Sequence, residues 1–525
     1  MKRLEPLEYL RLSRPRALLY RLSLWLESLP LALLGVFRAA LRVVRGFGLW
    51  LVSEARDIYS TFKRGGLAVK LSFLIFGVGQ LYYGQILRGL FFLLFEVAFA
   101  VYMLLPSGGI HWLSKCNWFE TGATVGTEQG RFEWVEQFGD RFKIWVAGDD
   151  SVKVLLYGLL TVFFILAFIY TWRLQLRGCR ICLDITDGGG RVRSGRDDLR
   201  SLLDDEFHKT LLALPVFGIA AFTVIPIIFM TLIAFTSYDA AHDGYSNLFS
   251  WMGLHHFNEL LNFEKGGLGL AFGEILSWTL MWAILATFTN FFLGMLVAML
   301  INKRGIKFKK FWRTALVMTI AIPQFVSLLY VAKLFDTSGI IGSALREWGL
   351  IPRFMLEESQ YGLWQNPITA RILVIAINVW VGIPYIMLIA TGILMNIPKD
   401  LYESSRIDGA GGFQQYTRIT LPYMMFVMGP YLLTSFVGNL NNFNVIYLLT
   451  ENNRLLNTEV GTAGGVAVTY TDLLITWLYK MTLNSGESRY YYASIVGIVV
   501  FLVVAVLSLI IYNLTPSTRN EEDYR

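Results

Sequence analysis

The chain has 525 residues, of which 55% are hydrophobic and only 16% are charged, and its formal net charge is +7. Soluble domains typically carry about 25% charged residues, so this composition excludes a soluble globular protein and predicts a protein of the lipid bilayer. The chain has only three cysteines, which excludes a disulfide framework.

The N-terminal region mixes apolar and basic residues. It lacks the uninterrupted apolar core and the small-residue cleavage site of a signal peptide. Between residues 10 and 60, Leu, Trp and Phe alternate with arginines such as Arg14, Arg38 and Arg42. This mixture is typical of an amphipathic helix on the anionic lipid of the cytoplasmic leaflet, and equally of a helix packed on the protein's own spans.

Eight stretches are long and apolar enough to cross a bilayer, which takes about 20 residues of helix. A shorter apolar run at 71–83 is too brief to span, and its glycines, with Gln80, predict a tight helical hairpin at the membrane surface. Glu96 lies inside the first span and needs a partner there. The predicted spans are residues 87–105, 154–172, 211–235, 275–301, 314–334, 372–396, 423–448 and 494–513.

Lysine and arginine are distributed unevenly between the loops that join these spans. With a cytoplasmic N-terminus, the inside segments contain 31 of these residues and the outside segments contain 10. This asymmetry predicts a multi-pass protein of the bacterial cell membrane with both termini in the cytoplasm. It also explains the basic net charge by topology, so no nucleic-acid partner is expected.

The chain divides near residue 210, because the Gly-, Asp- and Arg-rich stretch 173–210 sets the first two spans apart from the other six. The predicted fold is an all-α polytopic membrane protein with two accessory spans and a six-helix core. The predicted parts are an amphipathic cytoplasmic region (1–68), the accessory spans with their cytoplasmic loop (69–210), the core (211–513) and a cytoplasmic tail (514–525).

The predicted cytoplasmic loop at 398–422 contains helix-start and helix-stop signals. Pro398 suits the first turn of a helix, and Gly409 suits its end because glycine tolerates the left-handed conformation. A second short helix is expected from Phe413 to Ile419, with Pro422 starting the next span. The side chains expected to be exposed on this helix-turn-helix are Leu401, Tyr402 and Phe413.

This loop resembles the EAA loop of ABC-type import permeases, whose pattern is Glu, two small residues, three others, Gly, nine others, Ile, any residue, Leu and usually Pro. Serines replace the two usual alanines. The resemblance implies that the loop docks on a separate cytoplasmic ATPase dimer, with Glu403 as the charged contact and Gly409 allowing close approach. The residues implied to couple to the ATPase are Glu403, Ser404, Ser405, Gly409, Ile419, Leu421 and Pro422.

The chain itself contains no GxxxxGK[ST] phosphate loop and no Gly-Lys dipeptide. We therefore predict a transport subunit that is not an enzyme, with ATP hydrolysis in a partner. No cofactor or metal is expected. Cys179 and Cys182 form a lone CxxC pair, interpreted as ordinary reduced cysteines, and the adjacent His255 and His256 project differently on a helix.

The seventh predicted span carries neutral polar side chains. Ser435, Asn439 and Asn442 recur at i, i+4 and i+7 and share one face of a regular helix, while Asn444 lies roughly opposite. Amides and a hydroxyl suit the hydroxyl groups of an uncharged ligand, and they equally suit hydrogen bonds between helices. The chemistry alone leaves both interpretations open.

Residues 200–513 resemble the larger permease of maltose and maltodextrin importers (the MalF type), through Phe207-His208, the stretch 380–385 and the Ser-Phe-x-x-Asn-x-Asn-Asn-Phe run of the seventh span. The resemblance implies an oligosaccharide substrate, a second homologous permease and an extracellular sugar-binding protein. The residues predicted to contact the sugar are Ser435, Asn439, Asn442, Asn444, Val381, Gly382 and Tyr385.

Departures from that branch leave another sugar or glycoside open. Ile320 replaces a sugar-contacting Tyr, Gly438 replaces Phe and Asn444 replaces Val. The large external domain of the enteric form is absent, since the loop between the third and fourth spans is only 236–274.

Two mid-span prolines, Pro323 and Pro384, are predicted to kink the fifth and sixth helices, either along a transport path or simply for packing. An ion-coupled secondary transporter is a distant alternative, because the core spans are almost free of carboxylates. A membrane-bound glycosyl transferase would need a carboxylate or metal cluster, and the sequence offers none.

Overall fold

A computed structural model describes the chain from residue 41 to residue 514 and shows two compact units. One unit consists of residues 1–113 and 157–223, and the other of residues 114–156 and 224–525. Most of the predicted N-terminal region and nearly all of the predicted tail lie outside the described residues. Internal residues that are not described are 43–44, 138–139, 193, 196, 198–199, 202–203, 205–206, 246, 264–267, 304, 337, 350–362, 365, 451–466 and 484–487.

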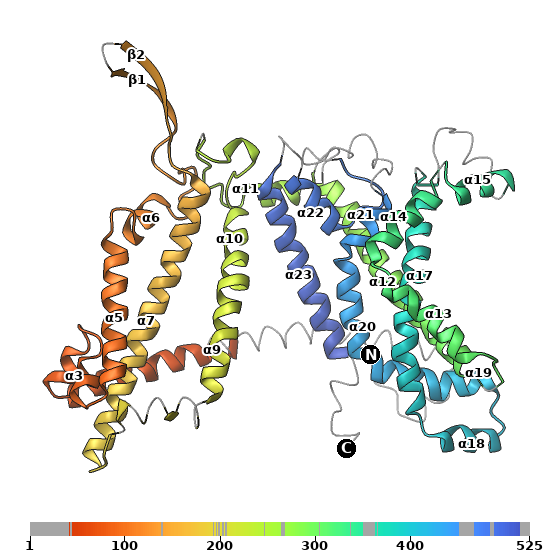
Figure 1. Cartoon of the computed structure of the whole chain (residues 1–525), viewed down its shortest axis with the longest axis horizontal. Helices are drawn as coiled ribbons and strands as arrows, with labels where there is room; N and C mark the ends of the chain where they lie inside the picture. The colour runs from red at the N-terminus through yellow and green to blue at the C-terminus, as the bar shows by residue number, and fades with distance from the viewer. Residues whose placement is uncertain are drawn as a thin grey trace, which may run out of the picture. The chain divides into compact units, whose positions relative to one another are not determined.

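The described part of the first unit is helical (Figure 1). Residues 45–64 form a helix that precedes the labelled elements. The labelled elements are α3 (Leu67–Leu71), α4 (Val78–Tyr82), α5 (Ile86–Leu104), most of α6 (Gly109–Lys115), most of α7 (Ser151–Asp187) and α9 (Phe207–Ile219). The π-helical turn η1 (Ala220–Val224) leads from α9 into α10.

The second unit contains the predicted core helices and one antiparallel hairpin, β1 (Arg131–Gln137) with β2 (Asp140–Val146), which the sequence analysis did not predict. Its other elements are α10 (Ile225–Ile233), η2 (Ala240–His242), α11 (His255–Leu260), α12 (Leu268–Asn302), α13 (Lys309–Ala321), α14 (Gln324–Leu334), α15 (Ile340–Glu347), α17 (Pro367–Met395), α18 (Lys399–Ile407), α19 (Gly412–Gln415), η3 (Tyr416–Thr420), α20 (Leu421–Leu440), α21 (Phe443–Thr450), α22 (Leu474–Leu483) and α23 (Tyr490–Leu514).

The span predictions are confirmed in number and place. Among the described residues, seven helices are long and apolar enough to cross a membrane, and the pair α13 and α14 makes an eighth if it counts as one bent span. All eight overlap the stretches expected from hydropathy.

The fifth span is broken rather than kinked. α13 and α14 meet at an angle of 95°. Ile322 and Pro323 between them have extended backbones, with ψ of 128° and 126°. Proline lacks an N–H donor and pushes the preceding residue out of the helical region, so both residues leave the helix together. α17, by contrast, continues through Pro384.

The predicted hairpin in the first unit is confirmed by α4 and α5. Gly77 begins the turn with φ of +82°, a conformation that favours glycine. Its N–H donates to the side chain of Gln175 at 3.0 Å, and the Gln80 amide donates to the Gln175 carbonyl oxygen at 2.6 Å. Glu96 accepts the backbone N–H of Phe76 at 2.8 Å, which answers its need for a partner inside a span.

Ion pairs hold the helix of residues 45–64 against α7. Arg173 donates to both carboxylate oxygens of Glu54, at 2.5 and 3.0 Å, and its guanidinium lies 4.7 Å from the centre of the Trp50 ring. Arg180 pairs with Asp57. For the described part of the N-terminal region, the structure therefore favours packing on the protein's own span over an independent helix on lipid.

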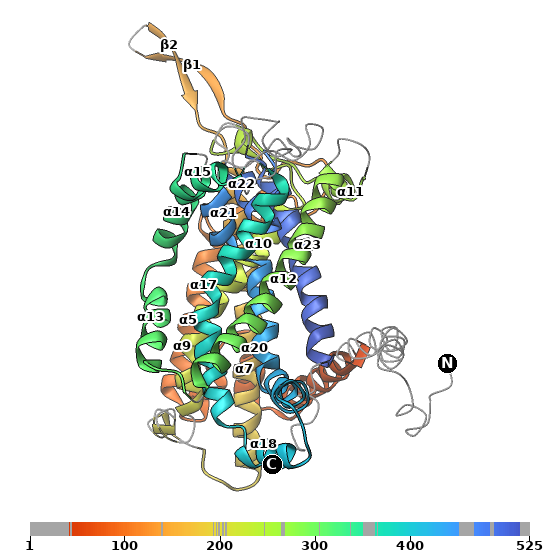
Figure 2. The ribbon, with the colours of Figure 1, turned by 90° about the vertical axis from the view of Figure 1, so that its right-hand side faces the viewer.

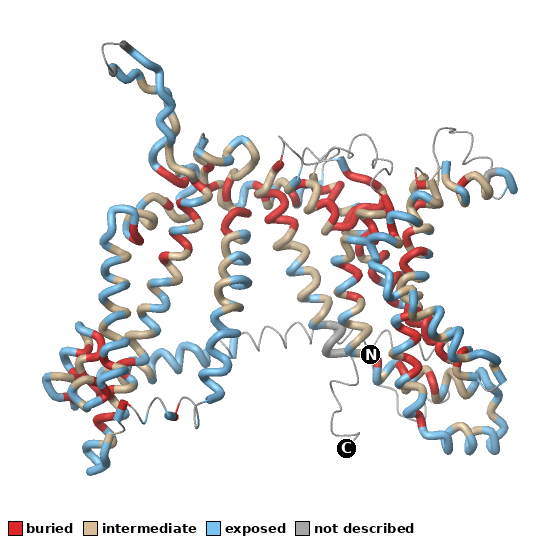
Figure 3. Tube along the Cα trace, viewed as in Figure 1, coloured by how far each residue is buried: buried red, intermediate tan, exposed pale blue. Residues whose placement is uncertain are grey.

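α12 is the central helix of the second unit and packs against α17 and α20. Buried positions follow its length in Figure 3. Small residues make the approach close, because a Cβ on Gly294 would stand 2.5 Å from the side chain of Ile386 in α17. In Figure 2, α18 lies at one end of this unit and α11, α15 and α22 lie at the opposite end.

Candidate functional site

The loop of residues 398–422, named the coupling loop here after the role that its resemblance to the EAA loop implies, forms the predicted helix-turn-helix. α18 follows Pro398 and is capped at its end by Asp408, after which Gly409 has φ of +78°. The N–H of Ala410 donates to the carbonyl oxygen of Ser405 at 2.9 Å and closes the turn. A residue with a Cβ is strained at this φ, so glycine is the residue that the turn requires.

The second arm of the coupling loop differs from the prediction. α19, η3 and α20 follow one another without a break, so the helix that was expected to stop at Ile419 continues into the span. Pro422 has no N–H to donate to the preceding turn, and the wider π-helical turn η3 lies directly before it.

The two arms of the coupling loop are tied together by polar contacts. Gln415 donates to Ser405 Oγ at 2.8 Å and to the carbonyl oxygen of Tyr402 at 3.2 Å. The hydroxyls of Tyr402 and Thr420 lie 2.8 Å apart. The prediction that Tyr402 is exposed is therefore wrong, because its ring turns toward the second arm. Ser405, which stands where the EAA pattern has alanine, supplies one of these acceptors.

Several coupling-loop side chains remain outside these contacts. Leu401 and Phe413 are exposed, as predicted, and so is Ile407, which the sequence analysis missed. Glu403 is exposed, and no ion pair links it to another described residue. Exposed apolar side chains on a polar loop are typical of a surface that another protein covers.

A cleft of about 360 Å³ lies in the second unit beside the break in the fifth span. Val381 and Tyr385, both predicted to contact the sugar, lie in its wall, together with Trp380. None of its lining residues carries a charge. The remaining lining residues are Thr319, Ile320, Ala321, Ile322, Pro323, Gln324 and Ser327.

A third predicted residue, Ser435, lies in α20 one helical turn from Tyr431. The rings of Tyr385 in α17 and Tyr431 in α20 are 6.1 Å apart. Tyr431 was not among the residues predicted from the sequence. Its spacing of four residues from Ser435 placed both on one helix face and could have identified it.

The asparagines of the seventh span do not share one continuous helix. α20 ends at Leu440 and α21 begins at Phe443, so the assumption of one unbroken helix across 423–448 is wrong, although the Asn442 amide still donates to Asn439 Oδ1 at 3.4 Å. Asn442 accepts the N–H of Val445 at 3.3 Å and so caps α21. An asparagine that caps a new helix explains why the chain breaks here.

Asn439 is a contact between helices. It is buried, and its amide donates to Thr287 Oγ1 in α12 at 3.0 Å. The indole of Trp282, also in α12, donates to the Asn439 carbonyl oxygen at 3.1 Å. Gly382 also faces α12, because a Cβ there would meet Asn290. Asn444 is exposed on α21 and is absent from the residues that line the cleft.

Residues 290–520 match the family described as "binding-protein-dependent transport system inner membrane component". The maltodextrin permease MdxF of Bacillus subtilis is 30% identical over 383 residues, which cover 72% of this chain and 85% of that protein. The chain belongs to this permease family. It is a permease subunit of a sugar importer of the ATP-binding-cassette class, a multi-pass membrane protein with a type I core.

Two other permeases extend the similarity over most of this chain. The galactooligosaccharide permease GanP of Bacillus subtilis is 29% identical over 86% of this chain and 97% of its own length. The maltodextrin permease MalC of Streptococcus pneumoniae is 28% identical over 84% of this chain and 93% of its own. The family match contains the whole coupling loop and all of the cleft, while α5 and α7 precede it.

Proposed function

We propose that this permease carries an uncharged oligosaccharide, maltose or maltodextrin, past the cleft at the break between α13 and α14. The lining of the cleft is the observation that carries the proposal. It combines two aromatic rings, Trp380 and Tyr385, with the neutral polar groups of Thr319, Gln324 and Ser327, and it has no charged side chain. Neutral hydrogen-bonding groups beside apolar rings suit sugar hydroxyls and sugar C–H faces.

The proposed sugar contacts are Val381, Tyr385 and Ser435, and Tyr431 joins them because its ring lies 6.1 Å from that of Tyr385 and one helical turn from Ser435. The other residues predicted from sequence, Gly382, Asn439, Asn442 and Asn444, stay predictions. The alternative substrate is another sugar or glycoside. The similarity to the galactooligosaccharide permease GanP supports this alternative.

The proposed mechanism uses the coupling loop as the contact with a separate cytoplasmic ATPase dimer. Glu403, exposed on α18, would meet a basic group of that partner, and Gly409 would allow close approach. Both termini would then be cytoplasmic, and α11, α15 and α22 would face the extracellular sugar-binding protein. The proposal includes a second, homologous permease and no catalytic activity in this chain.

The test compares uptake by variants of the cleft. In vesicles that contain the assembled importer, Tyr385→Ala should reduce uptake of a labelled maltodextrin by about 5- to 150-fold, since a sugar hydroxyl enclosed in the cleft would lose its hydrogen-bond partner, which costs about 1–3 kcal/mol. Tyr330→Ala in α14 is the matched control, because Tyr330 is exposed and is not among the lining residues. Normal uptake by Tyr385→Ala would overturn the proposed path. If the wild-type importer takes up a galactooligosaccharide and no maltodextrin, the substrate is the galactooligosaccharide.

A further inference from the structure

Two histidines and one glutamate project from the same side of the short helix α11. Helical residues are about 100° apart, so if His255 is set at 0°, His256 stands near 100° and Glu259 near 40°. The adjacent histidines alone were not expected to form a site, because they project differently from a helix. Glu259 removes that objection, since its carboxylate projects between the two imidazoles.

The distances agree with this helical geometry. His256 Nδ1 lies 2.9 Å from Glu259 Oε2, and His255 Nε2 lies 3.5 Å from Glu259 Oε1. One nitrogen or oxygen atom from each residue lies within 4.8 Å of the other two. Tetrahedral zinc with bonds of about 2.0–2.2 Å has ligand atoms roughly 3.3–3.5 Å apart, so small side-chain rotations would complete such a site.

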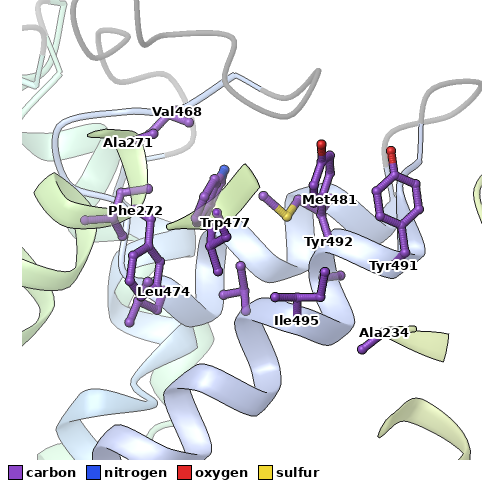
Figure 4. Close-up of a cluster of buried hydrophobic side chains, with 14 residues drawn as sticks. Ala234, Ala271, Phe272, Val468, Leu474, Trp477, Met481, Tyr491, Tyr492 and Ile495 are labelled. Atoms are coloured by element: carbon purple, nitrogen blue, oxygen red, sulfur yellow. The ribbon is translucent and has the colours of Figure 1, made fainter. Parts of the chain in front are cut away.

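The neighbouring helix α23 positions two of the three side chains. The Tyr492 hydroxyl donates to Glu259 Oε2 at 2.7 Å, and the ring of His256 stacks on that of Tyr491 at 4.1 Å. In Figure 4 the hydroxyl ends of both tyrosines point away from Ile495 and the apolar cluster. Side chains that fix the orientation of a ligand in this way are typical of metal sites.

Solvent access also suits a cation. His256 has a side chain only 10% exposed, whereas His255 is 58% exposed and Glu259 is 40% exposed, so an ion can enter from solvent.

We propose that His255, His256 and Glu259 bind a divalent transition metal of the zinc class. Two imidazoles and one carboxylate are ligands that zinc accepts, whereas magnesium and calcium require more oxygen atoms. The three ligands come from α11 alone, and one of them is held by α23 through Tyr492. A bound ion would lock the carboxylate and stabilise the corner where these two helices meet.

The experiment measures zinc binding to the full-length permease, purified with a tag that contains no histidine. Competition with a chromophoric chelator should show one zinc ion per chain, and His255→Gln should weaken binding by at least about tenfold, because it removes one of three ligands. His255 is the informative variant because it is exposed, so its replacement leaves the packing of α11 intact. Magnesium should not compete.

The matched control is His242→Gln. His242 pairs with Asp239 at 2.7 Å, so it resembles the proposed ligands chemically, but among the described residues no third His, Cys, Asp or Glu offers a ligand atom within 4.8 Å of both. Zinc should raise the unfolding temperature of the wild type and of His242→Gln equally, and should raise that of His255→Gln less at the same zinc concentration. Equal binding by wild type and His255→Gln, or no zinc bound by the wild type, would overturn the proposal.

Discussion

Gly382 in α17 lies so close to α12 that a Cβ atom placed on it would stand 2.6 Å from the amide nitrogen and oxygen of Asn290. Asn290 is itself buried, so it has little freedom to move aside. The contact joins the two helices that carry the wall of the cleft and the centre of the core. Its glycine is required by helix packing, whatever role it has toward the sugar.

Gly382→Ala should therefore destabilise the permease by about 1–3 kcal/mol, the usual range for overfilling a well-packed position. Gly392→Ala in the same helix is the matched control, because nothing lies within 4 Å of a Cβ there. Thermal unfolding in detergent should show a lower midpoint for the first variant and an equal or higher midpoint for the second. Equal midpoints for both would show that the α12–α17 approach is looser than described.

Asn439→Ala should lower the free energy of unfolding of the permease, besides any effect that it has on sugar binding. The change leaves Thr287 Oγ1 buried without its donor, which costs about 1–3 kcal/mol. Asn444→Ala, at an exposed position of α21, should change stability by less than about 0.5 kcal/mol. A double-mutant cycle of Asn439→Ala with Thr287→Val measures the pair directly. An interaction energy near zero would show that the contact with Thr287 does not stabilise the helices, and would favour a role of Asn439 in sugar contact.

The polar residues of the seventh span mark the limit of what could be predicted. Hydropathy located that span because about 20 apolar residues in a row have few alternatives to crossing a bilayer. The break after Asn441 depends on Asn442 capping a new helix, and asparagine is equally common in turns and on helix faces. The assumption of one unbroken helix through Ser435, Asn439 and Asn442 therefore fails where α20 ends.

The coupling loop was predictable because proline and glycine determine local backbone geometry, and Gly409 ends α18 as expected. Contacts between segments distant in the chain were not predictable. Tyr402 turns toward Thr420, and Gly382 meets Asn290 across a gap of 92 positions. No periodicity in one segment contains that information.

Asp149 should make the stability of the segment that carries it depend on acid pH. Burial alone would raise its pKa, but Lys115 Nζ at 2.7 Å and the N–H groups of Thr127 and Glu128 lower it below the ordinary value. A carboxyl with a lowered pKa stabilises the folded state above its unfolded pKa of about 3.9, and loses this contribution as pH falls.

Asp149→Asn should therefore flatten the fall in unfolding temperature between about pH 6 and pH 3, compared with the wild type. Glu136→Gln on the exposed hairpin is the control and should leave the pH profile unchanged. Identical profiles for Asp149→Asn and the wild type would contradict the assignment.

Topology can be tested by labelling single cysteines. Asn262→Cys should react with an impermeant maleimide from outside intact cells, and Lys307→Cys only after the membrane is opened. The background should be low because all three native cysteines are buried, and burial raises the pKa of Cys116 to about 12. The reverse labelling pattern would show that every span has the opposite orientation in the membrane.

The coupling loop offers the most direct test of the proposed energy coupling. The permease is reconstituted with its partner permease, ATPase and sugar-binding protein, and ATP hydrolysis stimulated by the loaded binding protein is measured for Gly409→Asp. Gly189→Asp is the control, since Gly189 also has positive φ, at +72°, with nothing within 4 Å of a Cβ. We expect stimulation to be lost in Gly409→Asp and kept in Gly189→Asp, with both complexes assembled. Full stimulation in assembled Gly409→Asp complexes would contradict the proposal that residues 398–422 transmit ATP hydrolysis to the sugar path.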